Sequence, residues 1–200
     1  MKKLLKETIV CMVKTSKRFI SILVIVLLGV GFFAGIRAVA PDMKNTLDDY
    51  YEKTNMYDIY IASNYGIRED IIDKLQKKYD IEAVYNFDTI TTKKEDYATK
   101  IISYDKNNQI NTPKLVKGKM PEAIDEVVID NNYRNEIKIG DKLTIDSELI
   151  KNNTVTVTGY VESPLYISAE RDSTNLLSGT IDYYLYMNDD NIISPVKTAA

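Results

Sequence analysis

Pairs of neighbouring carboxylates are the residues of this chain best suited by type to acid–base or metal chemistry. They include Asp48-Asp49, Glu95-Asp96 and Asp189-Asp190. Adjacent side chains on a helix or strand diverge instead of converging on one point, so we interpret the pairs as solvated surface charge. The sequence has no histidine and one cysteine, Cys11, which excludes Ser-His and Cys-His nucleophilic pairs, histidine metal sites and an intrachain disulfide. We therefore expect no catalytic centre, metal or cofactor.

Two further patterns are typical of binding instead of catalysis. Residues 105–109 have the polar composition of a calcium loop, but they lack its glycine and its terminal glutamate. Tyrosines gather around residues 57–60 and 183–186, where they are compatible with a sugar- or peptide-binding face. Tyrosine is also an ordinary strand-forming residue, and packing is the interpretation we favour for both clusters.

The charge distribution divides the chain at residue 18. Residues 1–18 contain six basic side chains and one acidic one, whereas the remaining 182 residues contain 20 basic and 28 acidic ones. Residues 19–36 carry no charge, and a helix over residues 19–40 would be about 33 Å long, enough to cross a hydrocarbon core of about 30 Å. The basic flank predicts a cytoplasmic N-terminus at residues 1–18 and an extracellular C-terminal domain. The folded part lacks the basic stripe that nucleic-acid binding requires, so we expect no such partner.

A cleaved signal peptide is the alternative interpretation of the apolar segment. Ala38-Val39-Ala40 resembles a small-x-small cleavage site. However, the uncharged run is longer than the roughly 7–15 residues of a signal peptide, and Pro41 would obstruct cleavage of the bond after Ala40. We favour a retained membrane anchor.

Two stripes of side chains predict how the N-terminal segments pack. Small residues with a G-x-x-x-G spacing would let a second helix approach the anchor closely, although glycine is common in membrane helices generally. These residues are Gly29, Gly31, Ala34 and Gly35. Upstream, an apolar stripe predicts a basic amphipathic helix on the membrane surface, with an unstructured basic segment as the alternative. The stripe consists of Leu5, Ile9, Met12 and Val13.

The residues beyond the anchor predict a stalk helix followed by an α+β domain. Residues 41–56 favour the stalk helix, because Pro41 is suited to a first helical turn. Residues 57–62, 69–79 and 81–92 then predict a strand, an amphipathic helix and a strand, which together would form a β-α-β unit.

Further strands are predicted along the rest of the domain, which we place at residues 57–190. They lie at residues 98–104, at 127–129, after a turn at Gly140-Asp141, at 154–162 and at 183–188. Residues 191–200 are expected to be a truncated tail. The predicted fold class is thus α+β, with one N-terminal transmembrane helix followed by a strand-rich mixed α/β extracytoplasmic domain.

Several segments together resemble the FtsX-like and MacB-like permeases of ABC transporters. The run LGVGFFAG, followed by Pro-Asp-Met at residues 41–43, is similar to the first membrane helix of long Gram-positive members. Residues 117–121, 126–129 and 139–143 resemble turns and a strand of the MacB-type core domain, and residues 157–171 resemble the same permeases. The turn residues singled out in this way are Gly118, Pro121, Gly140, Asp141, Gly159 and Pro164.

The resemblance implies a non-catalytic membrane subunit of a type VII ABC transporter. Such a subunit pairs with a cytoplasmic ATPase, forms homo- or heterodimers, and couples ATP-driven motion to export or to envelope regulation, with a peptide, lipid or envelope protein outside. The chain has no G-x-x-x-x-G-K-[ST] motif of its own. Such permeases have several membrane helices, so one helix implies the N-terminal segment of a longer protein. The alternative is a stand-alone, membrane-anchored extracellular sensor or binding module.

Overall fold

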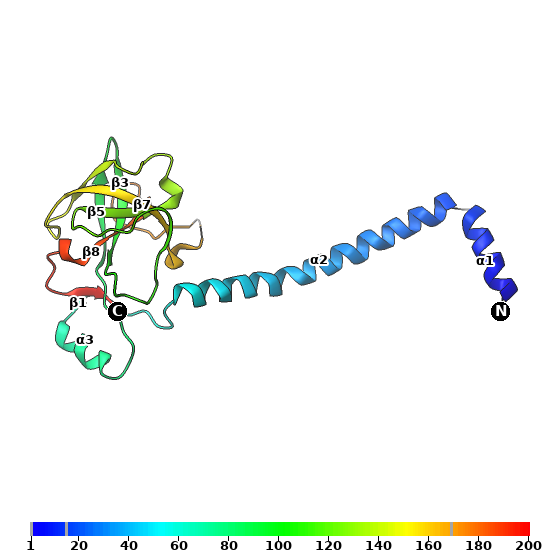
Figure 1. The fold of residues 1–200 in the computed structure, drawn as a ribbon, viewed down its shortest axis with the longest axis horizontal. Coiled ribbons are helices and arrows are strands. Elements are labelled where there is room, and N and C mark those ends of the chain that lie inside the picture. Colours follow the sequence, from blue (N-terminus) through cyan, green and yellow to red (C-terminus); the bar gives the residue numbers. More distant parts are fainter. Residues whose placement is uncertain (1, 15, 169) are drawn as a thin grey trace. The chain divides into compact units, whose positions relative to one another are not determined.

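The structure is a computed structural model that describes residues 2–14, 16–168 and 170–200; the side chains of residues 2, 12 and 13 lie outside its description. The chain divides into two compact units, Met1–Tyr50 and Tyr51–Ala200. The predicted fold class is confirmed: one long apolar helix precedes a strand-rich α/β unit (Figure 1).

The N-terminal elements are two helices, α1 (Lys2–Lys14) and α2 (Ser16–Thr54). α2 is long and apolar enough to cross a membrane, and its apolar stretch is exposed. The boundary expected at Pro41 is not a helix break, because α2 continues through this proline. A proline inside a helix removes one backbone hydrogen bond and favours a bend there.

The two predicted stripes lie on these helices. In α1, Leu5 and Ile9 are exposed, while the side chains of Met12 and Val13 are outside the described residues. The small residues of α2 are exposed as well, and a Cβ atom added at Gly29, Gly31 or Gly35 would meet nothing within 4 Å. Membrane-surface binding and helix–helix packing therefore remain predictions.

The second unit consists of short elements. They are β1 (Ala62–Ile67), α3 (Glu69–Gln76), β2 (Asn86–Thr92), β3 (Asp96–Tyr104), β4 (Lys114–Gly118), β5 (Glu126–Asp130), β6 (Lys142–Asp146), β7 (Thr154–Glu162), β8 (Tyr183–Asn188) and β9 (Lys197–Ala199). Short 3-10 helices η1 (Asn131–Tyr133), η2 (Pro164–Tyr166) and η3 (Asp189–Asn191) follow β5, β7 and β8.

Six strands form a closed ring of pairings. The ring runs β2–β3–β8–β5–β7–β6 and returns to β2, because β6 pairs with both β7 and β2. The β3–β8 and β5–β7 pairs are parallel, and the others in the ring are antiparallel. β4 pairs with β7 outside the ring. Closure gives each ring strand a partner on both sides, which is how barrels satisfy their backbone groups.

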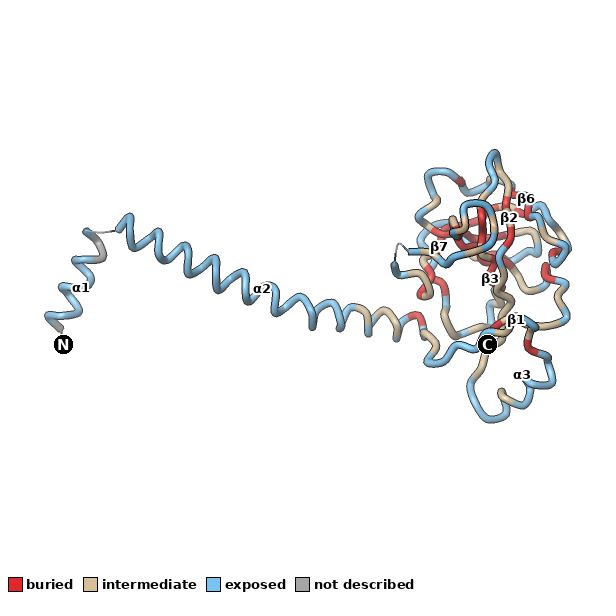
Figure 2. The backbone as a smooth tube through the Cα atoms, turned by 180° about the vertical axis from the view of Figure 1, so that it is seen from behind, coloured by how far each residue is buried: buried red, intermediate tan, exposed pale blue. Residues whose placement is uncertain are grey.

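Strands β3, β5 and β8 are buried on both faces. Ile101, Ile129 and Leu185 belong to one core cluster, which includes residues from β6 and β7 and fills the ring. The side chains that alternate with them, such as Ile102 and Tyr184, form a second cluster on the outer face. Figure 2 shows most of the buried segments within the strand-rich second unit. Double-sided burial explains why these strands are nearly continuous apolar runs in the sequence.

Three local predictions need correction. Residues 57–61 are not a strand; β1 begins at Ala62 and pairs with β9, so β1, α3 and β2 do not form a β-α-β unit in one sheet. Residues 191–200 are not a tail outside the domain, because they contain β9, and Ala199 also bridges to Val84. β4 was not expected as a strand. In each case the pairing partner lies far away in sequence, where local patterns carry no information.

We predict that Leu185→Ala destabilises the second unit by about 2–5 kcal/mol, because the side chain is fully buried and its removal leaves a cavity. Urea unfolding of the full chain in detergent micelles, followed by tyrosine fluorescence, measures the change. Leu149→Ala is the matched control, since Leu149 is 40% exposed and should lose far less. Equal losses in the two variants would contradict the assignment of the core.

Candidate functional site

The C-terminal end of α2 is closed by a specific cap. Asn55 has a φ of 47°, in the left-handed region that asparagine tolerates better than most residues. Its N–H donates to the carbonyl of Glu52 at 3.2 Å, and the N–H of Met56 donates to that of Tyr51 at 3.0 Å. These two bonds form a Schellman motif, which satisfies the last carbonyl groups of a helix.

The capped helix end is bonded to the loop between β3 and β4. The N–H groups of Asn111 and Thr112 donate to the carbonyl oxygens of Asn55 and Thr54, at 2.9 and 3.0 Å. Asn111 has a φ of 52°, so a second left-handed asparagine shapes the loop side of the contact. We call residues 54–57 and 109–112 the helix-end junction.

The side chains of the two asparagines complete the junction. Asn55 Nδ2 donates to the carbonyl of Gln109 at 3.1 Å, and Asn111 Oδ1 accepts from the N–H of Tyr57 at 3.1 Å. Four hydrogen bonds therefore join two segments that are more than 50 residues apart in sequence. Such bonds fix the loop against the end of the helix.

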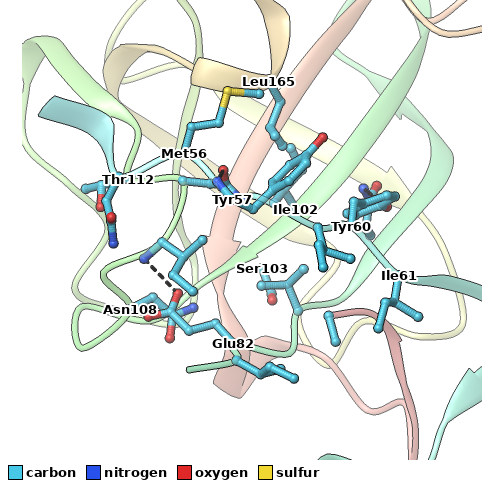
Figure 3. Close-up of a pocket in the computed structure, with 18 of the residues that line it drawn as sticks. Met56, Tyr57, Tyr60, Ile61, Glu82, Ile102, Ser103, Asn108, Thr112 and Leu165 are labelled. Atoms are coloured by element: carbon cyan, nitrogen blue, oxygen red, sulfur yellow. Dashed lines mark hydrogen bonds between the residues drawn. The ribbon is translucent and has the colours of Figure 1, made fainter. Parts of the chain in front are cut away.

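A cavity of about 570 Å³ lies beside the junction. Its walls come from residues 55–61, from residues 79–82 and from the outer face of β3 and β8 (Figure 3). The rings of Tyr57 and Tyr60 stack with their centroids 5.5 Å apart. The Glu82 carboxylate accepts hydrogen bonds from the N–H groups of Gln109 and Ile110, so it holds the junction loop from within the wall. The volume is typical of small-molecule sites.

The two tyrosine clusters have different roles. Tyr183, Tyr184 and Tyr186 are at most 3% exposed, which confirms packing as the role of the 183–186 cluster. Burial raises the pKa of Tyr183 to about 12. Tyr57 is half-buried and Tyr60 is 46% exposed, and both line the cavity.

An ion pair holds the segment after β7 on the outer face of the ring. Arg171 lies 2.6 Å from the buried Asp130, and its guanidinium covers the rings of Tyr166 and Tyr184 at 5.5 and 5.7 Å. Burial raises the pKa of both tyrosines, and Tyr166 Oη donates to Asp172 at 2.8 Å. Tyr166 and Arg171, which lie in the segment that resembles the permeases, therefore cover the core cluster on the outer face of the ring.

The turn residues singled out from the sequence shape the backbone at several places. Gly118 and Gly159 lie opposite each other on β4 and β7. A Cβ at Gly118, whose φ is +88°, would lie 2.2 Å from the carbonyl oxygen of Thr158, and one at Gly159 would lie 2.7 Å from that of Lys117. Only glycine permits this close approach of two backbones.

The other turn residues lie at separate positions. Pro121 is buried, and Gly140 turns with a φ of +93°. Asp141 forms an ion pair with Lys93 and accepts a hydrogen bond from the N–H of Lys138 at 2.6 Å, and these two contacts lower the pKa of Asp141. Pro164 opens η2. No common site among the described residues unites the six positions.

The carboxylate pairs named from the sequence do not come together with other ligand side chains in the described part of the structure. Among the described residues, no group of three or more histidine, cysteine or carboxylate side chains is arranged to hold a metal. Asp48, Asp49, Glu95 and Asp96 are exposed, and Asp189 forms an ion pair with Lys197.

Comparison with known proteins gives one structural likeness to report. No protein-family model and no curated protein matches the sequence. Among solved structures, the extracellular domain of the noncanonic ABC-type transporter YknZ from Gram-positive bacteria matches with a TM-score of 0.39 and 11% sequence identity, over 66% of this chain and 71% of that one. A TM-score of this size does not establish a shared fold.

Sequence reasoning missed the junction and the cavity. Asn55 comes two residues after Lys53, at the end of a helical pattern, and a lysine in the last turn followed by asparagine is a recognisable helix-stop signal. Nothing in the sequence links it to Asn111, since that contact arises from tertiary folding.

We predict that Asn55→Ala loosens the junction more than Asn55→Gly. Both variants lose the bond to Gln109, but alanine also resists the left-handed conformation, at a cost of about 1–2 kcal/mol that glycine avoids. Hydrogen exchange at the Met56 and Thr112 amides should be fastest in the alanine variant, while an amide of β8 serves as the internal control. Unchanged exchange in both variants would contradict the structural role of the cap.

Proposed function

We propose that this chain is the N-terminal part of an ABC-type permease subunit, in which α2 is the membrane anchor and the second unit is a non-catalytic external domain. The observation that carries the proposal is that one helix, α2, contains both the apolar stretch and the capped end bonded to the junction loop. The sequence motifs that resemble FtsX-like and MacB-like permeases support it, as does the basic segment before α2.

The junction supplies a route for mechanical coupling. A helix resists stretching along its axis, so movement of α2 along its axis would act on the loop of residues 109–112 through their shared hydrogen bonds. That loop connects β3, a member of the closed ring, to β4. Pro41 interrupts the hydrogen-bond ladder of α2 and provides a point where the helix can bend. We propose that ATP-driven motion reaches the external domain along this path.

The proposed role as a permease subunit implies three kinds of partner and a membrane surface. A cytoplasmic ATPase would drive the movement, since the chain carries no nucleotide-binding motif of its own. A second permease subunit would pack on the small-residue surface of α2, at Gly29, Gly31, Ala34 and Gly35. The basic α1 would lie on the cytoplasmic membrane surface. Outside, the domain would act on a peptide, a lipid or an envelope protein.

A stand-alone anchored sensor is the second candidate function. The cavity beside the junction favours it, because a ligand there would contact groups that hold the end of α2. This candidate needs the same topology but no ATPase.

We predict that the second unit lies outside the cell, because the basic residues precede the apolar helix. In intact cells, a membrane-impermeant maleimide should label Ser178→Cys, made in a Cys11→Ser background, since Ser178 is exposed. The unmodified chain, with Cys11 alone, is the matched control and should react only after permeabilisation. Labelling of Cys11 but not of residue 178 in intact cells would reverse the topology and end the proposal.

We also predict that the complete gene product, purified from its own cells in mild detergent, brings down an ATP-hydrolysing protein. An unrelated single-pass membrane protein with the same tag is the control. If the labelling places the domain outside but no ATPase co-purifies, the stand-alone sensor replaces the permease subunit.

A further inference from the structure

The cavity beside the junction has the volume of a ligand site. At about 570 Å³, it falls within the range of roughly 300–1,000 Å³ that such sites occupy. All of its lining residues belong to the second unit. One wall includes Ile102 of β3 and Leu165 of η2, and residues 55–61, which follow α2, form another (Figure 3).

The walls combine apolar and aromatic surface. Tyr57, Tyr60, Tyr79 and Tyr104 line the cavity, together with Tyr186, which is itself buried. The face of a tyrosine ring carries partial negative charge and attracts cations, most strongly where water is partly excluded. The protein itself provides an example at the rim, where Lys78 Nζ lies 5.2 Å from the centre of the Tyr79 ring.

The charged side chains that line the cavity are all negative. Asp58, Asp80 and Glu82 are the charged residues among the described residues of the wall, which include no lysine or arginine. Carboxylates beside low-dielectric walls focus a negative potential into a cleft. Charge complementarity therefore favours a positively charged occupant and opposes an anion.

A metal ion does not fit this arrangement. A bare divalent cation needs several oxygen ligands that converge on one point. The described residues contain no such group of three or more acidic, histidine or cysteine side chains. An occupant that spreads its charge over an apolar body suits the cavity better, because the rings and aliphatic side chains can contact that body while the carboxylates act at longer range.

We propose that this cavity binds a small organic cation with an apolar body, such as an ammonium group carrying aromatic or alkyl substituents. The proposal goes beyond the permease function, because binding requires only the second unit of this chain. Asn55, Asn111 and Thr112 line the cavity and also form the helix-end junction. Ligand binding therefore stiffens the junction.

Benzyltriethylammonium is a suitable probe, with N,N-diethylbenzamide as a neutral analogue and benzylsulfonate as an anion. Titrations use the full chain in an uncharged detergent, with binding followed by NMR of the protein amides. We expect the cation to shift the Asn111 and Thr112 amides saturably and to slow their hydrogen exchange. The neutral analogue should bind at least several-fold more weakly, and the anion should not bind.

The double variant Asp58→Asn/Asp80→Asn should weaken cation binding about tenfold, since each exposed carboxylate is worth roughly a factor of three. Asp146→Asn/Glu148→Gln removes the same charge from exposed residues outside the cavity and should leave the affinity unchanged. Unchanged NMR spectra elsewhere show that both variants fold.

Three results would overturn the proposal. The first is that the cation shows no saturable binding. The second is that the neutral analogue binds with equal affinity, which would make this a site for uncharged apolar ligands. The third is that the control variant loses as much cation affinity as the cavity variant. The topology and ATPase experiments do not depend on any of these results, so failure of the cation site and failure of the permease proposal are distinguishable.

Discussion

The structure depends on three strands, β3, β5 and β8, whose apolar side chains must be shielded from water on both faces of the sheet. β3, β5 and β8 present one set of side chains to the interior of the closed ring and another to the outside, and both sets are apolar or aromatic. Leaving the outer set in water would forfeit its hydrophobic stabilisation, so loops have to cover it. The segment that contains Leu165 and Tyr166 covers one part, fastened by the ion pair of Arg171. The cavity borders this face at Ile102 and Tyr186.

The residues that follow the end of α2 line the cavity beside this face. Its Schellman cap turns the chain at Asn55, and the following residues pass along the cavity beside Ile102 and Tyr186. The bonds to Asn111 and Thr112 attach this crossing to the loop after β3. The capped end of α2 and the loop of residues 109–112 are therefore hydrogen-bonded to each other, and both contribute residues to the cavity lining within the second unit. A helix that continues into an apolar stretch and a cavity whose wall includes the helix cap together support the coupling role proposed for the domain.

The residues that first suggested chemistry have mostly structural roles. Gly118 and Gly159 permit two strands to approach, Asp141 stabilises a turn through Lys138 and Lys93, and the tyrosines of β8 fill the core. The carboxylates with the best claim to a binding role, Asp58, Asp80 and Glu82, are scattered in sequence and belong to none of the adjacent pairs. Their common position in one wall is a consequence of folding.

The sequence by itself determined the features that depend on neighbouring residues. The uncharged run predicted α2, and local β-branched and aromatic character located β7 and β8 at their observed bounds, residues 154–162 and 183–188. Tertiary structure alone decided that β1 pairs with β9, that β6 closes the ring, and that Asn55 meets Asn111. Helical periodicity and strand propensity are properties of contiguous residues. The β1–β9 and β2–β6 pairings and the contact of Asn111 with the end of α2 join segments 50 to more than 100 residues apart, which meet only because the whole domain buries its apolar surface at once.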